Sequence, residues 1–330
     1  MKSHVLLLIV LMGGVVVARG AGPAKPDADL SPAQLEQKLV QFLKEGKQSE
    51  AEKLLFSHAS AHRNNQDVVF LRAALTRSRF MVPEAFRLFA AAAELGKDTP
   101  RGKCATYVMD LDRRRNVEEN FAALGKLVEA NPEDIFLRWM IAVECRTFDK
   151  NRLGADHYKK ILEKWDPGPS LVHQTYGNLL DNLQRYDEAL VERRKAVELE
   201  PAGWSYQGLG NTLRAMKRFD EAYDAFRESV RLAPDNPVYW RSWATALMAE
   251  RKFAEAIVKL QKAVDVDPQY ENAWVCWGKC LESTGDNQGA LEKYEKALKL
   301  DPSDDYALSG IARLKRQLEK AENPGKQASE

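Results

Sequence analysis

Small and apolar residues recur with a fixed period in the second half of the chain. The segments ELEP, RLAP, DVDP and KLDP end in prolines spaced 33, 34 and 34 residues apart, namely Pro201, Pro234, Pro268 and Pro302. Aligning the chain on these prolines gives three columns of small residues: Gly177, Gly210, Ala244 and Gly278; Ala189, Ala222, Ala256 and Ala290; Ala196, Ser229, Ala263 and Ala297. Small residues at facing positions let two helices approach closely, and proline ends a helix because it lacks an N–H. Each period therefore predicts two antiparallel helices.

The residues between these columns resemble a known repeat family. WRSWATAL from Trp240 and WVCWGKCL from Trp274 are similar to the tetratricopeptide pattern W-x2-L-G-x2-Y, which continues with A-x3-F and a proline. The large residue of the A-x3-F pair is present in three units, as Phe226, Leu260 and Tyr294. In the unit that starts at Ser170 this position is Arg193, which we interpret as a looser helix contact. The resemblance implies an all-α fold, a right-handed α-solenoid of helix-turn-helix repeats.

The same register continues towards the N-terminus with weaker matches. It predicts units that start near Pro32, Gln66, Arg101 and Phe136. The segment PEAFRLFAAAAELG from Pro83 also resembles the related Sel1-like repeats. We therefore expect four degenerate repeats over residues 31–169 and four clear ones over 170–304.

One more helix is expected after the last repeat. Residues 305–321 have helical periodicity, with four apolar residues on one side: Leu308, Ile311, Leu314 and Leu318. Charged residues occupy the other side, as a capping helix requires. The polar residues 322–330 after it are predicted to be disordered.

The N-terminus has the pattern of a secretory signal. Lys2 precedes 13 apolar residues, from Val5 to Val17, a stretch too short to span a bilayer comfortably. Small residues at Ala18 and Gly20 suggest cleavage after Gly20, which leaves residues 21–30 as a flexible lead-in. We expect an exported protein, periplasmic or extracellular. The alternative is that residues 1–20 stay attached as a membrane anchor.

Charge and composition exclude several function classes. Lys and Arg total 49 and Asp and Glu 48, so a net charge of +1 gives no field to attract nucleic acid. His58 and His62 lie four residues apart, as do Cys276 and Cys280, but neither pair has a third ligand in its motif. We interpret the histidines as surface residues and the cysteines as small apolar filler. No catalytic motif is present, and we expect no enzyme activity, cofactor or metal.

The resemblance also indicates where a partner protein would bind. In tetratricopeptide arrays the first helix of each pair lines the concave face, through the second, fifth, ninth and twelfth positions of the unit. At these positions we single out Gln174, Asn178, Trp204, Gln207, Asn211, Arg241, Thr245 and Lys279. Side-chain amides such as Asn178 and Asn211 can bind a peptide backbone, and Trp204 could act as an aromatic anchor. We assign the paired tryptophans, Trp240/Trp243 and Trp274/Trp277, to the core because the repeat pattern requires bulky residues there.

The sequence thus predicts an exported, non-catalytic scaffold that binds an extended peptide or a helix of a partner protein. Two alternatives remain open. One is a protein that binds a metal or small ligand on the same scaffold, through the histidine or cysteine pair. The other is a membrane-anchored subunit of an envelope assembly complex.

Overall fold

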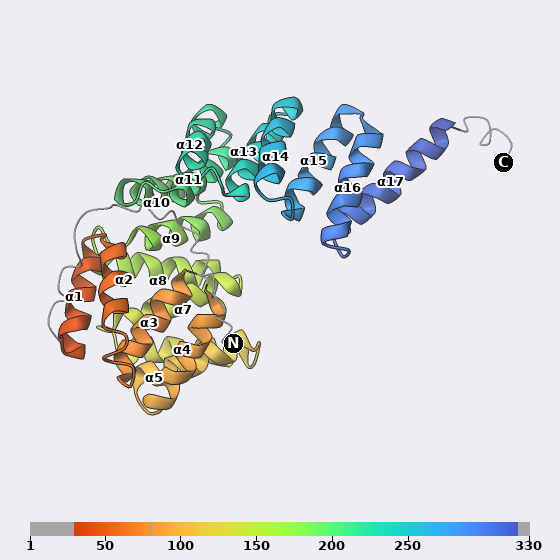
Figure 1. Ribbon diagram of the computed structural model, residues 1–330. Coiled ribbons are helices and arrows are strands. Elements are labelled where there is room, and N and C mark those ends of the chain that lie inside the picture. The colour runs from red at the N-terminus through yellow and green to blue at the C-terminus, as the bar shows by residue number, and fades with distance from the viewer. Residues whose placement is uncertain (1–29, 80, 323–330) are drawn as a thin grey trace, which may run out of the picture. The chain divides into compact units, whose positions relative to one another are not determined.

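The computed structural model describes residues 30–79 and 81–322, except for the side chains of the last four. This part of the chain forms seventeen α-helices and no strand, which confirms the all-α helical-repeat prediction. It divides into two compact units, residues 30–201 with α1 to α10 and residues 202–322 with α11 to α17 (Figure 1). The expected signal segment and most of the lead-in and tail lie outside the described residues. None of the helices between residues 30 and 322 combines the length and apolar character that a bilayer span requires.

The N-terminal unit consists of five consecutive helix pairs. The helices are α1 (Pro32–Lys44), α2 (Gln48–Ser57), α3 (Gln66–Ser78), α4 (Val82–Leu95), α5 (Pro100–Asp112), α6 (Val117–Ala130), α7 (Ile135–Thr147), α8 (Asn151–Lys164), α9 (Ser170–Asn182) and α10 (Tyr186–Leu199). The first helices α1, α3, α5 and α7 form an inner layer, because α3 contacts α1, α5 and α7. A backbone hydrogen bond of 3.2 Å from Gly168 N to Lys44 O joins the end of α1 to the loop after α8. The unit therefore closes upon itself.

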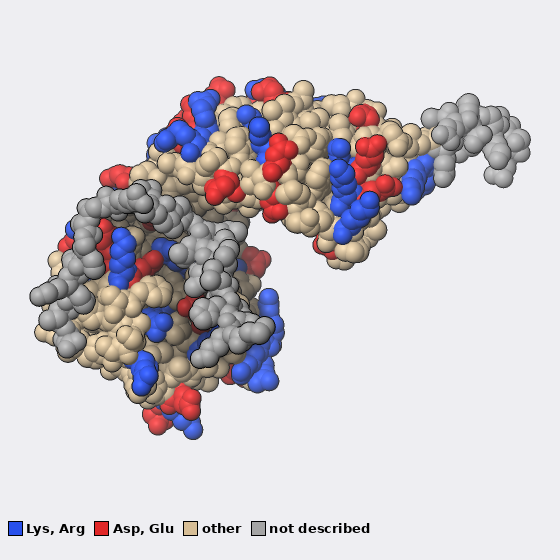
Figure 2. Space-filling view, viewed as in Figure 1, with Lys and Arg blue, Asp and Glu red and all other residues tan. Residues whose placement is uncertain are grey.

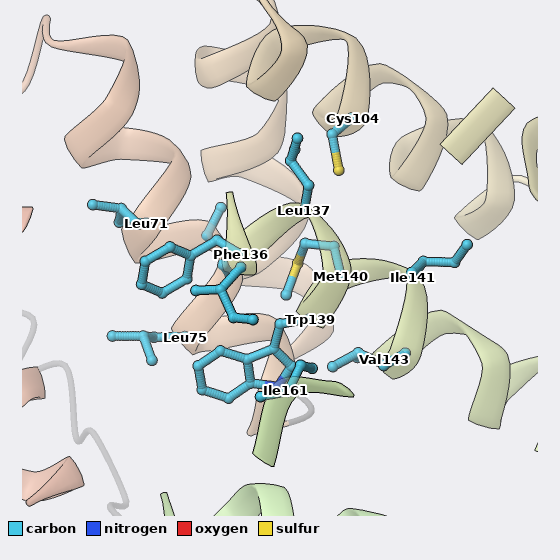
Figure 3. Packing of buried hydrophobic residues seen from close by; sticks show 14 of the residues in the cluster. Leu71, Leu75, Cys104, Phe136, Leu137, Trp139, Met140, Ile141, Val143 and Ile161 are labelled. Atoms are coloured by element: carbon cyan, nitrogen blue, oxygen red, sulfur yellow. The ribbon is translucent and has the colours of Figure 1, made fainter. Parts of the chain in front are cut away.

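The inner layer of the N-terminal unit is filled with apolar side chains. Ten of the thirteen residues of α3 and ten of the thirteen of α7 are buried. Trp139 and Trp165 pack edge to face with ring centroids 5.8 Å apart, and Figure 3 shows Trp139 among Leu75, Val143 and Ile161. α3 and α7 therefore have no open face for a ligand, whereas α1 and α5 bury only three and five of their thirteen residues.

The C-terminal unit has three helix pairs and a final single helix. Its helices are α11 (Gly203–Ala215), α12 (Phe219–Leu232), α13 (Pro237–Ala249), α14 (Phe253–Val266), α15 (Glu271–Thr284), α16 (Asn287–Leu300) and α17 (Asp305–Glu322). The short turn inside two of the pairs has a left-handed residue, Lys217 at φ 59° and Arg251 at φ 61°. Backbone bonds of 2.9 Å from Arg218 N to Leu213 O and from Lys252 N to Leu247 O then satisfy a carbonyl at each helix end.

Glycines in the first helices explain how closely the two helices of a pair approach. A Cβ on Gly210 would lie 2.7 Å from the ring of Phe226, and one on Gly278 would lie 2.5 Å from the ring of Tyr294. The aromatic ring of the second helix therefore occupies the volume that a side chain on the first helix would need.

The corresponding position in α10 corrects one expectation. Arg193 does not loosen its pair, because its side chain is 1% exposed and lies against Gly177. The guanidinium donates to the carbonyl of Gln174 at 2.8 Å, to Asn178 Oδ1 at 2.7 Å and to Asp181 Oδ2 at 2.7 Å. These three acceptors offset the loss of water, so an arginine can fill the position that an aromatic residue fills elsewhere.

The final helix covers the last repeat, but its buried side differs in part from the predicted one. Ala307 and Leu314 are fully buried, and a Cβ on Gly310 would lie 2.8 Å from the Tyr294 ring. Leu308, which we placed on the buried side, is instead 45% exposed. Ala307, Gly310 and Leu314 face the last repeat. The buried side of α17 therefore lies partly beside the predicted line of apolar residues and not wholly along it.

Candidate partner-binding face

The first helices of the C-terminal unit form its inner layer. α13 contacts both α11 and α15, whereas no comparable contact joins α12 to α14 or α14 to α16 among the described residues. When one row of helices touches along an array and the other row does not, the touching row lies on the inner side of the curvature. The face formed by α11, α13 and α15 is therefore the concave face that the repeat resemblance implies.

This face is less buried than α3 and α7 of the N-terminal unit. Only five of the thirteen residues of α13 and four of the fourteen of α15 are buried. All six singled-out residues of this unit are half-buried: Trp204, Gln207, Asn211, Arg241, Thr245 and Lys279. Each keeps part of its surface available to a ligand, so we name these six residues the inner-face set.

Three members of the inner-face set contact the next helix of the inner layer. Gln207 Nε2 donates to Ser242 Oγ at 3.1 Å. Arg241 Nε donates to the hydroxyl of Tyr270, just before α15, at 2.6 Å. Lys279 Nζ lies 3.5 Å from the ring centroid of Tyr306 on α17. These contacts hold long polar side chains in defined positions, which lowers the entropy lost when a ligand binds them.

Asn211 and Thr245 offer polar groups between those contacts. Thr245 Oγ1 donates to the carbonyl of Arg241 at 2.9 Å, which leaves its oxygen able to accept. The amide of Asn211 forms no hydrogen bond to another residue of the described chain. One amide and one hydroxyl on neighbouring helices thus provide donors and acceptors of the kind that a peptide backbone requires.

The structure adds aromatic and sulfur groups that the sequence pattern did not single out. Tyr270, Cys276 and Tyr306 lie beside Arg241 and Lys279. Burial raises the pKa of the Cys276 thiol, and Arg241 partly opposes this effect, so the group stays protonated at neutral pH. Tyr306 is the second residue of α17, so extending the register of groove positions to this helix would have found it.

Gln174 and Asn178 belong to the N-terminal unit and have a structural role. Gln174 is 9% exposed, and Asn178 is half-buried with its oxygen accepting from Arg193. Because that bond helps to satisfy a buried guanidinium, we expect replacement of Asn178 to perturb the fold. The two residues lie in a different unit from Gln207 and Asn211, and the structure does not place the two pairs relative to each other.

The paired tryptophans pack against the apolar core of the C-terminal unit, as expected, but they are not fully buried. All four are half-buried, and each pair is stacked, with ring planes 9° apart for Trp240 and Trp243 and 3° apart for Trp274 and Trp277. Lysines of the second helices cover the rings, with Lys259 Nζ 3.8 Å from the Trp243 centroid. An aliphatic lysine stem and its ammonium can cover an aromatic face while the charge stays solvated, so these rings need no apolar neighbour on that side.

The histidine and cysteine pairs form no recognisable metal site. His58 is 6% exposed, which contradicts its assignment to the surface, and its Nδ1 lies 2.9 Å from the carbonyl oxygen of Leu54. His62 Nε2 lies 2.8 Å from the carbonyl oxygen of Leu30. Between residues 30 and 322, no group of three or more His, Cys, Asp or Glu is arranged to hold a metal ion. Cys276 and Cys280 are free thiols, half-buried and buried respectively.

The N-terminal unit contains a cavity of about 410 Å³ whose charged walls are largely paired. Arg101 Nε donates to Asp134 at 2.7 Å, and its Nη1 donates to Glu36 at 2.9 Å. Lys164 pairs with Glu133 at 3.1 Å across the rim. The side chains around this cavity therefore bind one another, and we place no ligand site there.

Neither unit has a large surface area of one charge on the face shown in Figure 2. On the face seen in Figure 2, Lys and Arg alternate with Asp and Glu over both units without a continuous area of one sign. Many of these charges form pairs three residues apart on one helix, such as Arg218 with Glu221 at 2.7 Å. The open inner face is thus the more distinctive surface.

Comparison with known proteins agrees with this architecture. The tetratricopeptide repeat family model matches residues 204–236 and 271–304. No curated protein matches the sequence.

Several solved structures are similar to parts of the chain. YrrB, described as a TPR protein with an unusual peptide-binding site, aligns at 22% identity over 57% of this chain and 96% of its own, with a TM-score of 0.41. MamA 41-end from Desulfovibrio magneticus RS-1 aligns at 21% identity over 52% and 98%, with a TM-score of 0.44. The first TPR of Spaghetti (RPAP3), bound to the HSP90 peptide SRMEEVD, aligns at 25% identity over 35% and 92%, with a TM-score of 0.34. On the match to the family model, the chain contains tetratricopeptide repeats at residues 204–236 and 271–304.

Proposed function

We propose that this protein is a non-catalytic scaffold that binds an extended segment or a helix of a partner protein on the inner face of α11, α13 and α15. The observation that carries the proposal is the difference in burial between α3 and α7 of the N-terminal unit and α13 and α15 of the C-terminal unit. Ten residues of α3 and ten of α7 are buried, whereas α13 and α15 bury only five and four. A repeat array that leaves polar, half-buried side chains along its concave face is suited to hold a peptide.

The chemistry of the inner-face set supports a peptide partner. Asn211 and Gln207 can each donate and accept hydrogen bonds, as a peptide group does. Arg241 and Lys279 carry positive charge, and Trp204 supplies apolar surface. We expect backbone contacts to provide most of the affinity and the two cations to favour segments that contain acidic residues.

The test is capture of partner proteins by the purified chain, followed by replacement of inner-face residues. Asn211→Ala together with Lys279→Ala removes one amide and one charge without breaking a contact of the buried core. A matched control, Gln261→Ala with Lys262→Ala, removes the same two groups from the exposed side of α14. Circular dichroism shows whether each variant remains folded.

The expected result is that the inner-face variant loses a partner that the control retains. If both variants retain the same partner as the unaltered chain, binding lies elsewhere and the proposal fails. If the unaltered chain captures nothing specific from the envelope or the culture medium, the scaffold function is wrong as well.

We also propose that the protein is exported, on the basis of the apolar segment from Val5 to Val17. N-terminal sequencing of the protein from its native source tests this directly. A mature chain that begins at Ala21 supports export with cleavage. A chain that retains residues 1–20 and fractionates with membranes supports the anchored alternative, and a full-length chain in the cytosol contradicts both.

A further inference from the structure

Within residues 202–322, no helix packs against one side of α17. α17 follows Pro302 at the same three-residue spacing at which α15 follows Pro268, so it occupies the position of a first helix. In the preceding pair, α16 covers one side of α15 and places Tyr294 against Gly278. No second helix follows α17 within the described residues, so the corresponding side of α17 is open.

Six of the exposed residues of α17 form a stripe with opposite charges at its two ends, while exposed Tyr306 and Gln317 lie outside it. We name this the terminal stripe; its six exposed members are Asp305, Leu308, Ser309, Ala312, Lys315 and Arg316. Spacings of three and four residues place them on one side of the helix. The acid lies at the N-terminal end, the two bases lie at the other, and the small side chains of Ser309 and Ala312 lie between them.

The charges of the terminal stripe have no ionic partner among the side chains that the structure describes. Arg316 Nε donates only to the carbonyl of Ala312 in its own helix, at 3.1 Å. Neither Asp305 nor Lys315 forms an ion pair with a described side chain. Arg313, which is not part of the stripe, differs because it binds both oxygens of Glu282, at 2.7 and 2.8 Å. The stripe therefore keeps its charges available for another molecule.

We propose that the terminal stripe is a self-association surface, on which α17 of a second copy of this chain packs antiparallel. A two-fold axis between residues 310 and 311 would place Asp305 of each chain opposite Arg316 of the other. Every contact then occurs twice, as in other symmetric dimers. A parallel arrangement would instead bring the two acids together and the two pairs of bases together, which is unfavourable.

The size of the central residues fits close packing of the two helices. Asp305 and Arg316 are eleven residues apart, which is about 16 Å along a helix. Ser309 and Ala312 meet their counterparts near the axis and allow the helices to approach to about 8 Å. Leu308, 45% exposed in the single chain, would pack beside Ala312 of the second copy. The surface is a single helix, so we expect a weak, reversible dimer.

Charge reversal gives a sharp test, read by sedimentation velocity at low ionic strength over protein concentrations from about 1 to about 500 µM. The unaltered chain should shift from monomer to dimer over this range. Asp305→Arg places arginine opposite arginine at both ends, and Arg316→Asp places acid opposite acid, so each should weaken association about tenfold or more. A one-to-one mixture of these two variants restores opposite charges at both ends and should dimerise again.

Two controls separate this surface from others. Glu295→Arg makes a similar change of charge on exposed α16 and should leave association unchanged. Asn211→Ala alters the inner face on α11, away from α17, and should also leave it unchanged. The proposal fails if the unaltered chain stays monomeric, if the reversals associate as the unaltered chain does, or if the mixture of the two variants stays monomeric. It goes beyond the proposed scaffold function and is tested without the partner.

Discussion

Gly177 and Arg193 pack directly against each other in the pair α9 and α10. A Cβ on Gly177 would lie 2.9 Å from Nε of the arginine. In the C-terminal unit the matching contact joins Gly210 to Phe226. The same backbone arrangement therefore accepts either a hydrogen-bonded cation or an aromatic ring, provided that the first helix has no side chain at this point.

This contact predicts a graded response to substitution of Arg193. Arg193→Ala would leave Asp181 without its cation and open a cavity, and we expect a loss of about 3–5 kcal/mol in the free energy of unfolding. Arg193→Phe refills the volume as Phe226 does, so we expect a smaller loss of about 1–2 kcal/mol. Urea unfolding followed by circular dichroism measures both. Equal losses would show that the charge, and not the volume, decides stability here.

A second prediction concerns the buried cation of α3. Arg77 donates to both oxygens of Glu144 at 2.8 Å, and to Asp112 at 2.7 Å, and Glu144 is 0% exposed. Arg77→Ala leaves a buried carboxylate unpaired and should cost about 3–5 kcal/mol. The double change to Arg77→Met with Glu144→Leu should cost clearly less, because the fully buried carboxylate is removed together with its cation and only Asp112, 14% exposed, loses a partner.

The control for this prediction is an exposed pair in the same unit. Arg185 lies 2.7 Å from Glu188, and their side chains are 43% and 55% exposed. Arg185→Ala should change stability by less than about 1 kcal/mol. If Arg77→Ala has no larger effect than Arg185→Ala, the ion cluster does not stabilise the N-terminal unit.

The third prediction is a dependence of stability on pH that arises from His157. Burial lowers the pKa of this histidine to about 4, and Arg138 and Lys160 add to the effect. Between pH 6.5 and 4 the unfolded chain binds a proton at this residue and the folded chain does not. Its contribution to stability is therefore lost as the pH falls through this range, by roughly 1–3 kcal/mol in all.

Replacing the histidine isolates its contribution. Glutamine at position 157 cannot be protonated. The loss of stability of His157→Gln between pH 6.5 and 4 should therefore be smaller, by roughly 1–3 kcal/mol, than that of the unaltered protein. Thermal unfolding at half-unit steps of pH measures the two slopes. Identical slopes for both proteins would contradict a neutral His157 in the folded state.

The fourth prediction concerns the lysine that covers the tryptophan pair of α13. Lys259 Nζ lies 3.8 Å from the Trp243 ring centroid. Lys259→Ala removes both the ammonium and the stem that shields the ring, and should cost about 0.5–2 kcal/mol. It should also shift tryptophan emission to longer wavelength as water reaches the ring. Lys262→Ala, on the exposed side of the same helix, serves as the control, and an equal effect of both changes would refute the contact.

Helix positions were largely predictable because the repeat is local. Two first helices begin at Pro100 and Ile135, each one residue before the unit start that the register predicts. The residues of the inner face could be predicted in the same way, because they occupy fixed positions within each repeat. Such features depend on spacing along one or two helices, and spacing is visible in the sequence.

The surroundings of individual side chains were less predictable. Trp243 was expected in the core because its position in the repeat is normally bulky and apolar. It packs against the core, but it stays half-buried and the ammonium of Lys259 also lies over its ring. His58 was expected on the surface, yet its ring packs 6.4 Å from that of His62 and is buried. α3 and α7 are buried because they contact each other across two repeats. Such a contact produces no periodic pattern in the sequence, so it could not be predicted.

The backbone hydrogen bond from Gly168 to Lys44 has a consequence for how the chain unfolds. It joins residues 44 and 168, so the first helix pair cannot detach without disturbing the loop after the fourth pair. The C-terminal repeats contact only their neighbours, and their order can be lost stepwise from an end. Under force or in mild denaturant, the N-terminal unit should therefore open in one cooperative event, whereas the C-terminal unit should yield one helix pair at a time.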